Sequence, residues 1–82
     1  MDYEFIHNIN QVTLGKYIKW KHLNKWKGGF VVSVDEELNT VLVKRGNYFM
    51  TGYLKNRLFQ KLTLDERIIK RLDHILANQG KS

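Results

Sequence analysis

Lysines stand beside aromatic residues at several places in this chain of 82 residues. Cationic side chains bind phosphate groups and flat rings stack on nucleobases, so this combination predicts nucleic-acid binding rather than catalysis. Most of the cations are lysines, which act as point charges, so little sequence preference is expected. The candidate nucleic-acid-binding residues are Tyr17, Lys19, Lys21, Lys25, Trp26, Lys27, Lys44, Arg45, Tyr48, Lys55 and Arg57.

Charges of opposite sign are separated along the sequence. The chain carries a net charge of +6. Residues 5–34 contain five lysines and no acid, and residues 38–64 contain five basic residues and no acid. The eight acids fall into clusters within residues 2–4, 35–37 and 65–73. Charges placed for solubility alone are normally mixed in sign, so the sequence predicts a basic face.

The large aromatic residues have a second interpretation, as core residues. A small domain has few other large apolar groups, so Trp20, Phe30 and Phe49 are expected in the core. For Tyr17 and Trp26, burial and exposure remain open alternatives.

Nothing in the sequence has the spacing of a catalytic or metal-binding site. The three histidines fall on three different predicted elements, and the chain has no cysteine. The acids at 35–37 fall in a predicted exposed turn, where paired carboxylates have no dry cleft to separate their pKa values. We therefore predict a protein that is not an enzyme and has no catalytic residues, metal, cofactor or small-molecule substrate.

Apolar periodicity places the expected elements. Residues 1–12 are expected to form a short helix or an irregular lead-in that caps one end of the core. Strands are predicted over residues 15–21, 30–34, 41–43, 48–54 and 58–62. A loop is expected at 22–25, and turns at 28–29, 35–39 and 55–57. The glycines at 28–29 are expected to be flexible, and Gly52 to mark a bulge or bend.

Alternation with a period of two assigns the side chains of two strands to faces. In the first strand, one face is expected to carry Leu14, Lys16, Ile18 and Trp20, and the other Tyr17, Lys19 and Lys21. In the last strand, one face is expected to carry Leu58, Gln60 and Leu62, and the other Phe59 and Lys61.

A capping box marks the start of a C-terminal helix. Thr63 and Glu66 have the spacing at which each side chain bonds the backbone N–H of the other. An apolar stripe follows, made of Leu64, Ile68, Leu72, Ile75 and Leu76. We predict a helix over residues 64–78 that covers one opening or flank of the sheet. Its cations, Arg67, Lys70 and Arg71, are expected to be solvated.

Five short strands followed by a helix predict a mainly β fold with a C-terminal α-helix. A small antiparallel five-stranded barrel would leave no exposed edge strand. The alternative is an open antiparallel sheet packed by one helix. A single domain is expected over residues 1–82, with a lead-in at 1–12, a barrel at 13–62 and a helix at 63–79.

The central hairpin resembles a known family. Gly29 opens the segment GFVVSV, a turn and the segment NTVLV follow, and Gly46-Asn47 closes the unit. This pattern over residues 26–47 resembles the KOW motif, an SH3-like barrel element found in ribosomal proteins and transcription elongation factors. The resemblance implies an SH3-like barrel in which Gly29 and the valines are fold residues. The family's connecting loop often touches nucleic acid and tends to be basic. Here residues 35–37 are acidic, so a loop contact is not carried over.

Two function classes follow. The first is a non-catalytic module that binds DNA or RNA with low sequence specificity. The alternative is a protein-interaction module or a small regulator of a larger complex in transcription, translation or a phage–host system. Such a protein would bind its partner through the helix at 64–78 or an edge strand. No apolar run approaches the ~20 residues that cross a bilayer, so no membrane partner and a cytoplasmic, nuclear or host-cytoplasmic location are expected.

Overall fold

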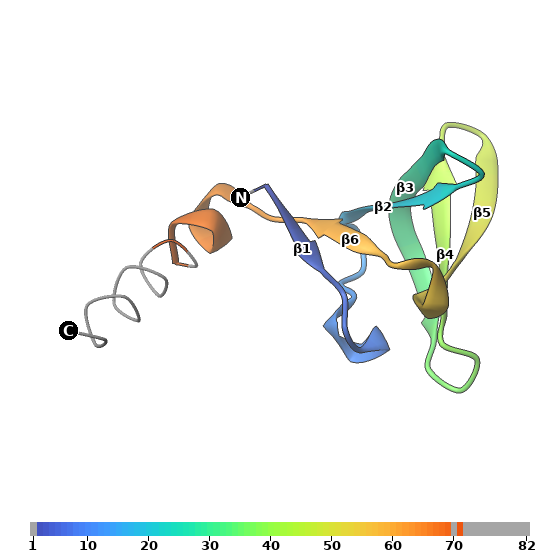
Figure 1. Ribbon diagram of the computed structural model, residues 1–82, viewed down its shortest axis with the longest axis horizontal. Helices are drawn as coiled ribbons and strands as arrows, with labels where there is room; N and C mark the ends of the chain where they lie inside the picture. The colour runs from blue at the N-terminus through green and yellow to red at the C-terminus, as the bar shows by residue number, and fades with distance from the viewer. Residues whose placement is uncertain (1, 70, 72–82) are drawn as a thin grey trace.

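The computed structural model describes residues 2–69 and 71, and its main element is one antiparallel sheet (Figure 1). The strands are β1 (Tyr3–Phe5), β2 (Tyr17–His22), β3 (Lys25–Asp35), β4 (Thr40–Arg45), β5 (Tyr48–Tyr53) and β6 (Phe59–Lys61). Two 3₁₀ turns, η1 (Ile9–Gln11) and η2 (Leu54–Asn56), join them. A helix begins at residue 64. The prediction of a mainly β fold with a C-terminal helix is confirmed.

The strand order is β1-β6-β2-β3-β4-β5. Strands β2 to β5 form a meander, and β6 returns to pair with β2. The sheet has six strands and is open, with β1 and β5 at its edges, which agrees with the alternative architecture. The count of five strands was wrong because β1 was missed. A three-residue strand whose partner lies near residue 60 leaves little local signal.

The core lies on the concave face of this curved sheet. Its buried residues are Ile6, Ile18, Trp20, Val31, Val41, Val43 and Leu58. A Cβ atom added to Gly52 on β5 would lie 3.0 Å from the Trp20 ring on β2, so these strands face each other across the core. Of the bulge or bend expected at Gly52, the bulge is wrong, because Gly52 pairs regularly with Val41. The glycine makes room for Trp20.

Strand alternation decides which aromatic residues are buried. Trp20 is 3 % exposed, as expected for the core, whereas Phe30 is 58 % exposed and Phe49 is 57 % exposed, so for these two the core prediction is wrong. Phe30 stands between the buried residues Gly29 and Val31 and must therefore point outward. Leu14 precedes β2 and is also exposed, so it does not share the face of Ile18 and Trp20 to which it was assigned.

The central hairpin is confirmed as the antiparallel pair β3–β4, with a register shift between Val31 and Ser33. The Asp35 carboxylate accepts a hydrogen bond of 3.0 Å from the Leu38 N–H in its turn. However, β3 begins at Lys25, so the glycines at 28–29 lie inside a strand and are not a flexible turn. The turn between β2 and β3 is formed instead by Leu23 and Asn24, with φ of 50° and 63°. The expected loop at 22–25 is thus a two-residue turn.

Both glycines of β3 lie at close approaches between strands. A Cβ on Gly28 would lie 2.5 Å from the Ile18 carbonyl oxygen, and one on Gly29 would lie 2.7 Å from the Lys44 carbonyl oxygen. Glycine is needed here for lack of space rather than for flexibility.

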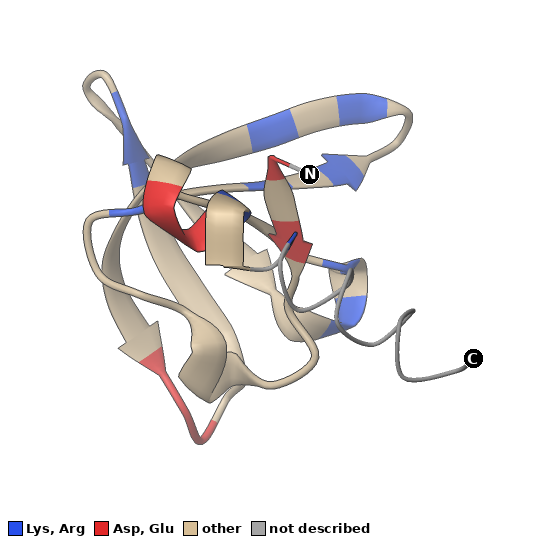
Figure 2. Ribbon diagram, turned by 90° about the vertical axis from the view of Figure 1, so that its left-hand side faces the viewer, with Lys and Arg blue, Asp and Glu red and all other residues tan. Residues whose placement is uncertain are grey.

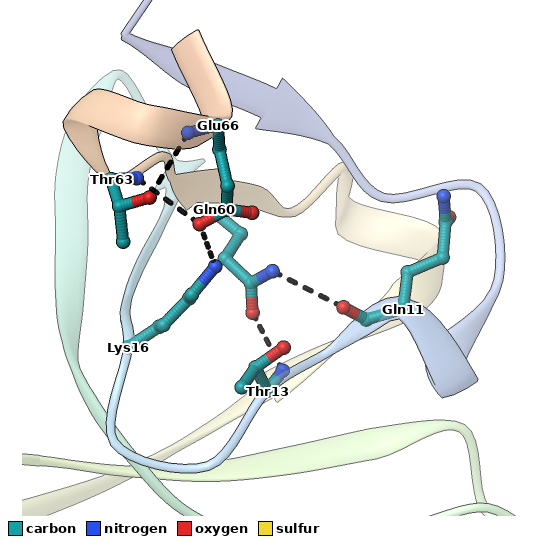
Figure 3. Close-up of polar contacts among 6 residues, drawn as sticks. All are labelled: Gln11, Thr13, Lys16, Gln60, Thr63 and Glu66. Atoms are coloured by element: carbon teal, nitrogen blue, oxygen red, sulfur yellow. Dashed lines mark hydrogen bonds and ion pairs between the residues drawn. The ribbon is translucent and has the colours of Figure 1, made fainter. Parts of the chain in front are cut away.

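The last strand and the N-terminal segment are joined by a buried amide. Leu58, Gln60 and Leu62 share one face, as predicted, and that face is buried. The Gln60 side chain accepts a hydrogen bond of 2.7 Å from the Thr13 N–H and donates one of 3.1 Å to the Gln11 carbonyl oxygen (Figure 3). Residues 2–12 therefore pack on the core through a strand and a 3₁₀ turn, where only a helix or an irregular lead-in was expected.

The predicted capping box is present. The Thr63 N–H donates to Glu66, and the Glu66 N–H donates to the Thr63 hydroxyl, each at 3.2 Å (Figure 3). Yet Leu64, Ile68 and Ile69 are 50–62 % exposed, so the described helical residues do not bury an apolar stripe on the sheet. Ion pairs from Glu66 to Lys16 and from Arg67 to Asp2 hold the helix start. The remainder of the predicted helix lies outside the described residues.

Within the part of the chain that is described, no helix is long and apolar enough to span a membrane.

Candidate nucleic-acid interface

The antiparallel meander places a group of basic residues and the acids at 35–37 at opposite ends of the sheet. The turns at 23–24 and 46–47 lie at one end because β2 to β5 alternate in direction, and the acidic turn after Asp35 lies at the other. Figure 2 shows blue segments along the β2–β3 hairpin and beside the β4–β5 turn, and red at the opposite turn. We call the end with turns 23–24 and 46–47 the basic end.

The β2–β3 hairpin extends past β4 at the basic end, because Phe30 is the residue that pairs with Lys44. The overhang leaves an open hollow of about 600 Å³. It is lined by Lys25, Trp26, Lys27, Arg45, Gly46, Asn47, Tyr48 and Met50. Three cations and two aromatic rings thus border one hollow, and no acid lines it.

Trp26 is 52 % exposed, which resolves the open question about this ring in favour of the surface. The Nζ atoms of Lys19 and Lys21 lie 4.7 Å and 5.7 Å from the ring centroid. Such cation–π contacts contribute about 0.5–1 kcal/mol at exposed positions. They hold lysine charge beside the indole face without neutralising it.

Tyr17 is half-buried, between the two expected outcomes. Its ring packs edge-on against Phe30 at a centroid distance of 5.5 Å. Its hydroxyl oxygen lies over Gly28, 2.9 Å from where a Cβ would stand. Tyr17 therefore covers the glycine on the outer face of the sheet and helps to hold β2 against β3.

Lys44 and Tyr48 extend the candidate surface along β4 and β5. Lys44 is exposed, and its Nζ lies 5.7 Å from the Phe49 ring centroid. Tyr48 is 77 % exposed at the rim of the hollow. Within residues 2–69 and 71, no ion pair involves any of the candidate cations.

The structure does not bring Lys55 to the basic end. Lys55 lines a different hollow, of about 410 Å³, together with Leu38, Asn39, Tyr53 and Leu54. Thr40 pairs with Tyr53 there, whereas Arg45 pairs with Tyr48 at the basic end, so about 16 Å of strand separates the two. Arg57 lies in the turn between η2 and β6, where its φ is 62°. It lines neither hollow.

Sequence reasoning missed three aromatic residues on the outer face, namely Tyr3, Phe5 and Phe59. The Lys19 Nζ lies 3.8 Å from the Tyr3 ring centroid, and the Phe59 ring is 6.2 Å from that of Trp26. For Tyr3 and Phe5 the one local signal was their alternation about Glu4, which is weak because it spans only three residues.

The two carboxylates with a shifted pKa, Glu66 and Asp2, lie at the helix start. Hydrogen bonds from Lys16 and from Thr63 lower the pKa of Glu66 below its ordinary value. A hydrogen bond from Arg67 and its charge lower the pKa of Asp2. Among the described residues, no three His, Asp or Glu side chains are placed to bind a metal ion. The cations and aromatic rings of the basic end suit a ligand that carries both negative charge and flat rings.

Comparisons with known protein families, with curated proteins and with solved structures find no match for this chain.

Proposed function

We propose that this protein is a non-catalytic module that binds nucleic acid at its basic end with little sequence preference. One observation carries the proposal: three cations and two exposed rings border a single hollow that no acid lines. Phosphates supply the charge that such a surface attracts, and nucleobases supply flat faces for its rings. Lys19, Lys21 and Lys44 add charge beside it.

The finer fold assignment belongs to the same proposal. We assign the strands β2 to β6 to an SH3-like barrel of the KOW type. The return of β6 to pair with β2 supports this assignment, as does the tight packing of Gly29 against β4. The proposed site of action is the cytoplasm, the nucleus or a host cytoplasm.

A salt titration tests the binding. Neutralising four to six phosphates of a duplex gives a slope of about −4 to −5 in a plot of log affinity against log salt concentration. The measurement is fluorescence anisotropy of a labelled DNA duplex at several salt concentrations. Affinity that does not depend on salt, or no binding at low salt, would contradict the proposal.

One lysine substitution made at each end of the sheet locates the contact. Lys27→Ala should make the slope shallower by roughly one unit, because one phosphate contact is lost. Lys55→Ala removes the same charge from the other end and should leave the slope unchanged. Equal effects would show attraction to the overall net charge rather than to the basic end.

Protein interaction is the second candidate, and the exposure of Leu64, Ile68 and Ile69 favours it. An apolar helix face of this kind fits the groove of a protein partner. Binding to a partner protein that survives nuclease treatment and about 0.5 M salt, and that Ile68→Lys abolishes, would support this candidate.

A further inference from the structure

A row of aromatic rings crosses the outer face of the sheet. Phe5 on β1 pairs with Phe59 on β6, and Phe59 pairs with Lys19 on β2. Directly paired residues project to the same face of a sheet. The Phe59 ring contacts Phe5 at 5.5 Å and Trp26 at 6.2 Å between centroids, with interplanar angles of 62° and 70°. We call Phe5, Phe59 and Trp26 the ring row.

The two outer rings of the row are exposed, Phe59 between them is half-buried, and lysine flanks the row. Phe5 is 37 % exposed and Trp26 is 52 % exposed. The Lys19 Nζ lies between the Tyr3 and Trp26 rings, at 3.8 Å and 4.7 Å from their centroids. Glu4, which separates Tyr3 from Phe5 in sequence, pairs with Gln60 and projects to the opposite face. The outer face therefore offers aromatic surface and positive charge together.

Trp26 belongs to both the ring row and the hollow at the basic end. Lys27 pairs with the buried Trp20 and so projects to the inner face, whereas Trp26 pairs with Lys21 on the outer face. On the outer face, a bound chain can pass from Lys21, over the indole, to the rings of β6 and β1. The path crosses β3, β2, β6 and β1, which are neighbours in the sheet.

This arrangement discriminates between the forms of nucleic acid. In a duplex the base faces are covered by their neighbours, so exposed rings would meet only phosphate and sugar and gain nothing from stacking. In a single strand the base faces are accessible, and lysines beside aromatic rings are the surface that such strands bind without sequence preference.

Resting on the proposed function, we propose that the preferred ligand is single-stranded nucleic acid whose bases stack on Trp26, Phe59 and Phe5. The lysines beside the rings hold its phosphates. Stacking on a ring does not read the 2′-hydroxyl, so single-stranded DNA and RNA are both ligands.

The test compares four fluorescent probes, each about 12 nucleotides long, which falls within the site sizes of small single-strand-binding modules. They are an oligothymidylate, an oligouridylate, an abasic strand with the same phosphates, and a DNA duplex. We expect both oligonucleotides to bind roughly tenfold or more tighter than the duplex or the abasic strand, and only these two to quench Trp26 fluorescence.

Leucine substitutions remove the aromatic face and keep an apolar side chain. Phe59→Leu should weaken oligothymidylate binding roughly 5- to 150-fold and leave duplex binding within about twofold. Tyr53→Leu is the matched control, because Tyr53 also carries a lysine over its ring but lies at the other end of the sheet. It should change neither affinity by more than about twofold. If Phe59→Leu fails to fold, Trp26→Leu at an exposed position gives the same comparison for the oligothymidylate.

The outcomes separate this inference from the proposed function. If the duplex and the abasic strand bind as tightly as the oligonucleotides, and Phe59→Leu changes nothing, the single-strand inference is overturned while nucleic-acid binding stands. If none of the four probes binds at low salt, both are overturned.

Discussion

The two ends of the sheet are built from the same strands and differ in what their charges do. At the acidic end, Asp35 has a role in folding, because its carboxylate accepts the Leu38 N–H within the turn. At the basic end, the turn at Leu23 and Asn24 is made by backbone with positive φ, and its lysines take no part in it. Charged side chains that the fold does not require, such as the lysines of the basic end, are therefore a better indicator of binding than charged side chains with a role in folding, such as Asp35.

The largest expected effect comes from reversing the charge of the basic end. The triple variant Lys25→Glu/Lys27→Glu/Arg45→Glu replaces attraction with repulsion around the hollow and should weaken nucleic-acid binding at least about 100-fold. These side chains are exposed, so the fold should persist. Anisotropy measures the affinity, and circular dichroism checks the fold.

The matched change at the acidic end is Glu36→Gln/Glu37→Gln, which spares the Asp35 turn contact. Removing two negative charges far from the hollow should change affinity by no more than about threefold. If this variant gains as much affinity as the triple variant loses, the difference between the two ends has no bearing on binding.

An intermediate effect, on the free energy of unfolding, is expected at Gly29, where the β2–β3 hairpin packs against β4. Gly29→Ala would bring a methyl group to 2.7 Å from the Lys44 carbonyl oxygen and should lower the free energy of unfolding by about 1–3 kcal/mol. Urea denaturation measures the change. Gly46→Ala is the comparison: nothing lies within 4 Å of its added Cβ, and its φ of 60° should cost about 1 kcal/mol. Equal losses would show that Gly29 is not a packing position.

The smallest effect is a pH dependence at the helix start. The pKa of Glu66 is lowered in the folded protein from its ordinary value of 4.5, chiefly by the hydrogen bond from Lys16. A carboxylate whose pKa is lower in the folded protein than in the unfolded chain stabilises the folded protein at pH values above its unfolded pKa. That stabilisation should be complete above about pH 5 and lost as the pH falls through the lowered folded value.

Thermal unfolding across this pH range measures the effect, with Glu66→Gln as the control. Glutamine still accepts the Thr63 N–H but does not titrate, so its pH profile should be flatter than that of the natural sequence. Superimposable profiles would show that Glu66 contributes nothing to the pH dependence.

The sequence predicted those parts of the fold that depend on local pattern. The period of two correctly assigned Ile18 and Trp20 to one face of their strand, and the spacing of Thr63 and Glu66 predicted the helix start. The loop expected at 22–25 contains the β2–β3 turn, but the start of the next strand was placed too late, because the glycines at 28–29 resemble a turn and are in fact packed inside β3.

The candidate site was predicted only where neighbours in sequence are also neighbours in space. Lys25, Trp26 and Lys27 share one hairpin, and Lys19 and Lys21 lie on the strand that pairs with it. Phe5 and Phe59 were missed because their contact depends on the pairing of β1 with β6, across more than 50 residues. For the same reason Lys55 was grouped with cations that lie at the opposite end.

Chemical-shift mapping by NMR tests the contrast between the two ends most directly. A single-stranded oligonucleotide is added to the ¹⁵N-labelled protein, and the shift of each backbone amide is followed. We predict that the largest shifts fall at residues 19–27 and 44–48 and at Phe5 and Phe59, with little change at residues 35–39 and 53–55. Shifts centred on the acidic turn, or spread evenly over both ends, would contradict the assignment of binding to the basic end.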